Sequence, residues 1–137
     1  MSAAPPWMRR WLAFAGIYNL AWGAVMVVAP VWSLGVLGVR SEHREYWPEF
    51  WGCIGMIIGV YGIGYLIAAR DPIRHWPIVL VGLLGKVFGP IGFVEAASRG
   101  ALPWSMGWTL LTNDLLWWAP FGLILLRARQ AHREAAQ

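Results

Sequence analysis

Hydrophobic residues fill four long stretches of the chain, and short polar connections separate them. The stretches cover residues 11–29, 51–69, 77–97 and 107–126, and the first two contain no acidic or basic side chain. At about 1.5 Å of helical rise per residue, each stretch can cross a hydrocarbon core about 30 Å thick. The pattern predicts an all-α integral membrane protein, in which residues 1–137 form a single domain with a bundle of four transmembrane helices.

The composition agrees with a membrane protein and changes how the net charge is interpreted. Hydrophobic residues make up 58% of the chain and charged residues only 13%, whereas a soluble domain has about 25% charged residues. The net charge of +4 comes from arginines that gather near helix ends. We therefore expect these basic residues to meet the lipid bilayer, and we expect no nucleic-acid partner.

The distribution of basic residues predicts the orientation of the bundle. Seven of the eleven basic residues lie in the N-terminal segment, the connection between the second and third stretches, and the C-terminal tail. By the positive-inside rule these segments are cytoplasmic, so both termini face the cytoplasm. The seven residues are Arg9, Arg10, Arg70, Arg74, Arg127, Arg129 and Arg133.

The connection after the first stretch has two parts. Residues 30–39 alternate Gly and Ser with apolar residues and are too few to span a membrane. We expect them to form a turn or short helix at the outer interface. Residues 41–49 are polar and predict a solvated loop.

Glycine recurs at helical spacing in the second and third stretches. In each stretch four glycines follow at spacings of three, four and three residues, which places them on one helical face. Small residues in such rows allow helices to approach closely in lipid. We therefore expect these two helices to form a tight antiparallel pair along the two rows. The glycines are Gly52, Gly55, Gly59 and Gly62, and Gly82, Gly85, Gly89 and Gly92.

One charged side chain lies deep inside each of the last two stretches. By helical rise, Lys86 lies about 13 Å and Asp114 about 20 Å from the cytoplasmic end, a difference that a lysine side chain can span. A charge at this depth must be paired with an opposite charge, be hydrated, or serve a function such as ligand binding or proton transfer. Asn19 and Asn113 bring further polar groups to the same level. Three tryptophans within the helices border it: Trp22, Trp117 and Trp118.

Two prolines free main-chain carbonyls beside these charges. Pro90 has no N–H for the carbonyl of Lys86, and Pro120 has none for the carbonyl of Leu116. Such carbonyls need a new partner at membrane depth. Three interpretations stay open: a Lys86–Asp114 ion pair that fixes the helix register, a site for a ligand or for proton-linked chemistry, or two unpaired groups that snorkel toward the membrane surface. Buried ion pairs stabilise weakly, which favours some role beyond stability.

Metal chemistry has little support in the sequence. The three histidines, His43, His75 and His132, fall in two loops and a tail, and no pair shares a helical face. The chain has one cysteine, Cys53, which excludes an intrachain disulfide. We expect no metal site, and the sequence indicates no particular cofactor.

Three segments resemble a known group of proteins. They are AARDP at residues 68–72, GLLGK at 82–86 and TNDLLWW at 112–118. These segments are similar to signatures of small bacterial four-helix membrane proteins that are broadly DoxX-like. The resemblance implies a four-helix bundle in the bacterial inner membrane and adds weight to Lys86, Asn113 and Asp114. DoxX itself is linked to quinone-coupled sulfur oxidation, but none of the three segments carries that chemistry.

Three functional hypotheses fit these features. The first, which we favour from the sequence, is an accessory or structural subunit of a larger respiratory or photosynthetic membrane complex, or a homo-oligomer. The second is a binder of a lipophilic molecule such as a quinone, isoprenoid or pigment, held against Trp22, Trp117 and Trp118. The third is a small membrane enzyme or a proton-linked transporter that uses Lys86 and Asp114. On the first hypothesis the chain is not an enzyme.

Overall fold

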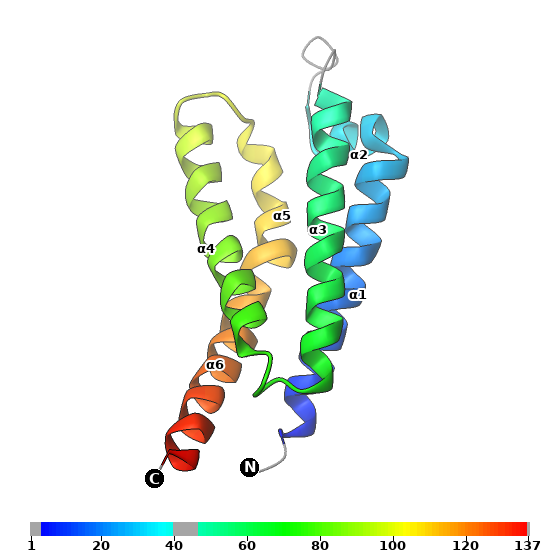
Figure 1. The fold of residues 1–137 in the computed structure, drawn as a ribbon. Coiled ribbons are helices and arrows are strands. Elements are labelled where there is room, and N and C mark those ends of the chain that lie inside the picture. The colour runs from blue at the N-terminus through cyan, green and yellow to red at the C-terminus, as the bar shows by residue number, and fades with distance from the viewer. Residues whose placement is uncertain (1–3, 40–46, 137) are drawn as a thin grey trace.

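Four long helical spans make up the computed structural model, which describes residues 4–39 and 47–136 (Figure 1). Each span is long and apolar enough to cross a membrane, which confirms the helical architecture expected from the hydropathy pattern. The first three spans are α1 (Pro6–Val28), α3 (Trp47–Arg70) and α4 (Trp76–Ser98). The last span is assembled from η2 (Trp104–Gly107), α5 (Trp108–Leu110), η3 (Leu111–Leu115) and α6 (Leu116–Ala135).

The spans are arranged as two pairs. Figure 1 shows α1 beside α3, and α4 beside the span that contains α5 and α6, with both termini at the same end of the molecule. A core of buried side chains from all four spans joins the pairs toward that end, with Leu12, Tyr65, Val79 and Phe121 among its members. A smaller cluster around Leu34 and Met106 lies toward the other end. The deeper core is thus on the side of the termini.

The glycine row of α3 packs against α1. A Cβ atom added at Gly23 would lie 2.5 Å from the carbonyl oxygen of Gly55, and one added at Gly62 would lie 2.8 Å from that of Gly16. The predicted tight pairing of α3 with α4 along their glycine rows is therefore wrong. The physical reason is what each helix meets on α3. Gly16 and Gly23 of α1 face Gly62 and Gly55, so the two backbones approach, whereas at Gly82 of α4 the Tyr65 ring of α3 fills the space between the helices.

The glycines of α4 do not form such an interface. A Cβ added at Gly85 or Gly92 would meet no atom within 4 Å, and the same holds for Gly52 and Gly59 on α3. Those four positions have room for a side chain, although the backbone of Gly59 itself lies close to Gly23 on α1. The predicted list of packing glycines is therefore too long, because a row of small residues indicates where backbones can approach and not where they do.

A short helix, α2 (Pro30–Val36), follows α1 directly. This agrees with the short segment expected after the first span. The Ser33 hydroxyl donates to the carbonyl of Ala29 at 3.0 Å and accepts from Trp51 Nε1 at 3.0 Å, which ties α2 to α3. Most of the predicted polar loop at 41–49, together with His43, lies outside the described residues.

The last span differs from a uniform helix of residues 107–126. It begins as a 3₁₀ turn, passes through a π-helical segment at Leu111–Leu115, and continues nine residues beyond 126 to Ala135. The continuation is rich in Ala, Arg, Gln and Glu, which are strong helix formers, so a polar sequence can extend the helix beyond the apolar span.

Candidate functional site

The π-helical segment η3 supplies carbonyl groups to two side chains. Trp117 Nε1 donates to the main-chain oxygen of Thr112 at 2.8 Å, and Lys86 Nζ donates to the main-chain oxygen of Asn113. A π segment shifts its carbonyls out of the regular α-helical register and often marks a functional site. Here a lysine from another helix reaches one backbone oxygen of the segment, that of Asn113.

The main-chain carbonyl of Lys86 also has a partner in the last span. Pro90 cannot bond the carbonyl of Lys86, and Trp118 Nε1 donates to that oxygen at 3.0 Å. The freed carbonyl was expected to need a partner, and that partner is the indole of Trp118 in the last span. Lys86 thus joins α4 to the last span through both its side chain and its carbonyl.

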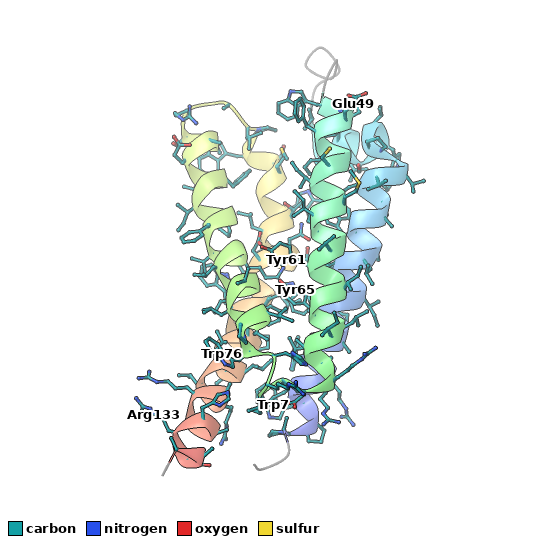
Figure 2. The ribbon with its side chains drawn as sticks, in the orientation of Figure 1. Trp7, Glu49, Tyr61, Tyr65, Trp76 and Arg133 are labelled. Atoms are coloured by element: carbon teal, nitrogen blue, oxygen red, sulfur yellow. The ribbon has the colours of Figure 1, made fainter. Side chains whose placement is uncertain are left out.

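A cavity of about 190 Å³ lies beside this junction and receives a polar side chain from each of the four spans. Asn19 comes from α1, Tyr65 from α3, Lys86 from α4 and Asp114 from η3. Figure 2 shows Tyr61 and Tyr65 between α3 and the pair formed by α4 and the last span. Apolar residues of α3 and two glycines of α4 complete the wall. Most of the polar groups expected at this depth therefore meet at one place.

Several polar groups of the cavity lack a protein partner. Asn19 is 5% exposed and Tyr65 is 1% exposed. Among the described residues, none forms a hydrogen bond with the Asn19 amide, the Tyr65 hydroxyl or the Asp114 carboxylate. No fully enclosed side-chain nitrogen or oxygen in that part of the chain is left unpaired, so these groups open into the cavity. A polar group in an apolar surrounding is costly unless something bonds to it.

The two central charges share the cavity without forming a direct ion pair. The ammonium of Lys86, a residue that is 7% exposed, bonds the Asn113 carbonyl and lies 5.6 Å from the centre of the Trp117 ring. Within the described residues, the ion pair that does form is Arg99 with Glu95, at 2.6 Å on the exposed end of α4. Asp114 lies instead against the backbone of α4, where a Cβ added at Gly89 would be 3.6 Å from its carboxylate.

The three tryptophans expected around this site have different positions. Trp117 is fully buried and packs against α1, with its ring centre 5.4 Å from Phe14 and 5.8 Å from Tyr18. Trp118 is half-exposed and lies along α4 through its bond to Lys86. Trp22 packs in the cluster around Leu34 and does not line the cavity. None of the three tryptophans lines the cavity, so the expectation that they border one site is wrong. Trp117 and Trp118 contact Lys86 itself, whereas Trp22 lies three residues beyond Asn19 toward the other end of α1.

Sequence reasoning missed the two tyrosines of α3. Tyr61 and Tyr65 are four residues apart, so they occupy one helical face, and their ring centres are 6.2 Å apart. The Tyr65 ring lies directly against α4 at Gly82, where an added Cβ would collide with it. The available signal was two hydroxyl-bearing residues well inside an apolar span, rather than at its ends where tyrosine is common.

The described residues contain no group of three metal-ligating side chains. Comparison of the chain with protein-family models, with curated proteins and with solved structures found no match. The resemblance to DoxX-like proteins therefore stays a prediction.

Proposed function

We propose that the protein binds a lipophilic molecule whose polar head enters the cavity between the four spans. The observation that carries the proposal is the convergence of Asn19, Tyr65 and Asp114 on one cavity, where the described structure gives their polar groups no partner. A ligand head that bonds these groups would offset the cost of placing them inside an apolar bundle.

The chemistry of the wall indicates the class of ligand. The Tyr65 hydroxyl and Lys86 ammonium are donors, the Asp114 carboxylate is an acceptor, and the Asn19 amide is both. A small head with carbonyl or hydroxyl oxygens complements this set. Quinones, quinols and isoprenoid alcohols combine such a head with an apolar tail, which could extend between the helices toward lipid. The cavity volume of about 190 Å³ suits a head group and not a whole molecule of this kind.

Thermal unfolding of the detergent-solubilised chain tests the proposal. The probes are a short-tailed benzoquinone and farnesol, and an alkane of equal length serves as the ligand control. A saturable rise in Tm is expected with at least one probe and not with the alkane. Tyr65→Phe removes a hydroxyl that faces the cavity. Its matched control is Tyr18→Phe, because the Tyr18 hydroxyl bonds Thr112 at 2.9 Å outside the cavity.

The expected result is a probe affinity weakened about 2- to 12-fold in Tyr65→Phe, as for the loss of one hydrogen bond, with Tyr18→Phe close to wild type. The proposal is wrong if neither probe raises Tm, or if the alkane raises it equally. Equal weakening in both tyrosine variants would place the ligand elsewhere.

The proton-linked alternative has less support from the geometry. Lys86 bonds a main-chain oxygen, and no direct ion pair joins it to Asp114. Proton transfer between the two side chains would therefore need a bridging group in the cavity. A bound ligand head would be such a group, so this chemistry depends on the binding function proposed above.

The accessory-subunit hypothesis stays a prediction. A membrane helix bundle exposes apolar side chains whether it faces lipid or another subunit, so the exposed faces of α1 and α3 do not favour either. Copurification from native membranes under mild detergent tests it. A stable larger complex would support the hypothesis, and a monomer that retains its lipophilic ligand would contradict it.

We also propose that both termini face the cytoplasm of a bacterial cell. The support is that α1 begins, the 71–75 connection turns and α6 ends on one side of the bundle, where seven of the basic residues lie (Figure 1). Reporter fusions after residues 73 and 102 should read inside and outside. A C-terminal fusion that reads outside would reverse the assignment.

A further inference from the structure

A second, larger cavity lies at the end of the molecule that holds the termini. It has a volume of about 690 Å³ and is formed between the first turns of α4 and the polar continuation of α6. None of its lining residues takes part in the cavity that contains Lys86. Figure 2 shows Trp76 and Arg133 at this end of the two helices.

The floor of this groove is apolar and continuous with the spans. Trp76 and Leu80 are four residues apart on α4, and Leu125 faces them from α6. Trp76 is 37% exposed at the first turn of its span, the level at which tryptophan meets lipid headgroups. An apolar chain lying on this floor would continue into the membrane.

The wall beyond the floor is cationic. Arg129, His132 and Arg133 line it from successive turns of α6, and the groove lining includes no acidic residue. Neither arginine forms an ion pair with any residue in the described part of the chain. Two unpaired guanidinium groups beside an apolar floor match a phosphate that is joined to acyl chains, because arginine bonds phosphate oxygens in pairs.

The opposite face of the same helix is different. Arg127 lines a separate small cavity that also contains Glu134 and the N-terminal residues Ala4 and Pro5. The charge there is partly balanced, and the groove face carries the uncompensated charge. The two faces of the extended end of α6 therefore differ in charge. The face that lines the groove is the one that fits an anion.

We propose that the groove between α4 and the end of α6 binds one acidic phospholipid, with its phosphate at Arg129 and Arg133 and the start of its acyl chains on Trp76, Leu80 and Leu125. Basic pockets beside membrane helices recognise anionic headgroups in this way. The bound lipid would tie the polar continuation of α6 to the membrane surface.

The test uses the full chain in detergent with phosphatidylglycerol, phosphatidylcholine or inorganic phosphate. Native mass spectrometry counts bound lipid, and thermal unfolding gives the affinity. Phosphatidylglycerol should bind with a stoichiometry of one and raise Tm. The double change Arg129→Gln and Arg133→Gln should weaken its binding roughly 30-fold, or about fivefold for each arginine. Arg127→Gln is the matched control and should leave the affinity within about twofold of wild type.

Each other result overturns the proposal. Equal weakening by Arg127→Gln would mean a general effect of net charge. Equal stabilisation by phosphatidylcholine would mean recognition of acyl chains alone, and equal stabilisation by inorganic phosphate would mean a simple anion site. Binding of a polyglutamate peptide, without binding of phosphatidylglycerol, would make the groove a docking surface for an acidic protein.

Discussion

The interface between α1 and α3 and the surroundings of α4 use glycine in opposite ways. At the first, Gly23 and Gly55 bring two backbones so close that a single added carbon would collide. On α4, Gly82 makes room for the Tyr65 ring of α3, and Gly89 makes room for the Asp114 carboxylate of the last span. Glycines at the same spacing therefore form a close helix pair between α1 and α3 and leave space for polar side chains beside α4.

The difference shows that a row of glycines predicts where space is available on a helix. It does not predict which helix occupies that space. Where the facing helix also has small residues in register, backbones meet. Where the facing helix has tyrosine or aspartate, the space takes polar side chains. The first region stabilises the fold, and the second holds the groups that are available for binding.

The strongest test of the comparison is Gly23→Leu. A Cβ at this position would already lie 2.5 Å from the Gly55 oxygen and 3.0 Å from the Gly59 nitrogen. We expect a loss of about 3 kcal/mol or more, the upper end for overpacking, because neither backbone can move aside without separating the pair. The measurement is thermal unfolding in detergent. The control is Gly52→Leu, whose Cβ would meet nothing within 4 Å. Similar stability of the two variants would contradict the close α1–α3 pair.

A smaller loss is expected in the polar region from Lys86→Met. This change leaves the Asn113 carbonyl without its lysine donor and the Asp114 carboxylate without a nearby opposite charge. We expect a cost of about 1–3 kcal/mol, the range for one buried group left unsatisfied. Adding Asp114→Asn should recover part of it, because the uncompensated charge is then gone. Wild-type stability of the single variant would show that Lys86 is not needed at the π-helical segment.

The bond from Trp118 to the freed carbonyl of Lys86 should contribute less. Trp118→Phe is expected to cost about 0.6 kcal/mol and no more than about 1.7 kcal/mol, the range for such bonds in membrane proteins. Pro90→Ala would return a helical N–H to the same carbonyl, so Trp118→Phe should cost less in that background. Unfolding of the four proteins in the double-mutant cycle gives the coupling energy. A cost of Trp118→Phe that is the same in both backgrounds would contradict this assignment.

A gain in stability, rather than a loss, is expected from Gly85→Ala. A Cβ here would meet no atom within 4 Å, and Gly85 lines the cavity. The unliganded protein should gain up to about 1 kcal/mol from the higher helix propensity of alanine. Binding of the benzoquinone or farnesol probe should weaken, because the methyl group takes space from the head. A loss of stability would indicate an unrecognised close contact, and unchanged probe binding would place the head away from α4.

Much of the fold could be predicted from hydropathy alone. The spans at 51–69 and 77–97 agree with α3 and α4 to within a few residues at each end, because apolar length sets the limits of a membrane helix. The partner of the α3 glycines could not be predicted. Gly16 and Gly23 on α1 and Gly82 and Gly89 on α4 are both seven residues apart, so both helices offered the same register.

The charged residues of the candidate site could be predicted from the sequence, but the contacts that they form could not. Lys86, Asp114 and Asn19 stand out because their surroundings are apolar, and the structure brings them to one cavity. The π-helical segment at Leu111–Leu115 has no distinctive residue type. The bond between Lys86 and the Asn113 carbonyl could therefore not be predicted from the sequence. Tyr65 was missed because its hydroxyl is a small part of a large apolar side chain.

The antiparallel contact between α1 and α3 has a consequence for biosynthesis. Its close approaches, Gly16 with Gly62 and Gly23 with Gly55, lie within the first 62 residues. Translation proceeds from the N-terminus, and N-terminal units generally fold first. The chain for this pair is therefore complete before α4 is translated. Within the membrane, α1 and α3 can therefore pair, with Asn19 and Tyr65 on them, before the later half of the chain adds Lys86 and Asp114.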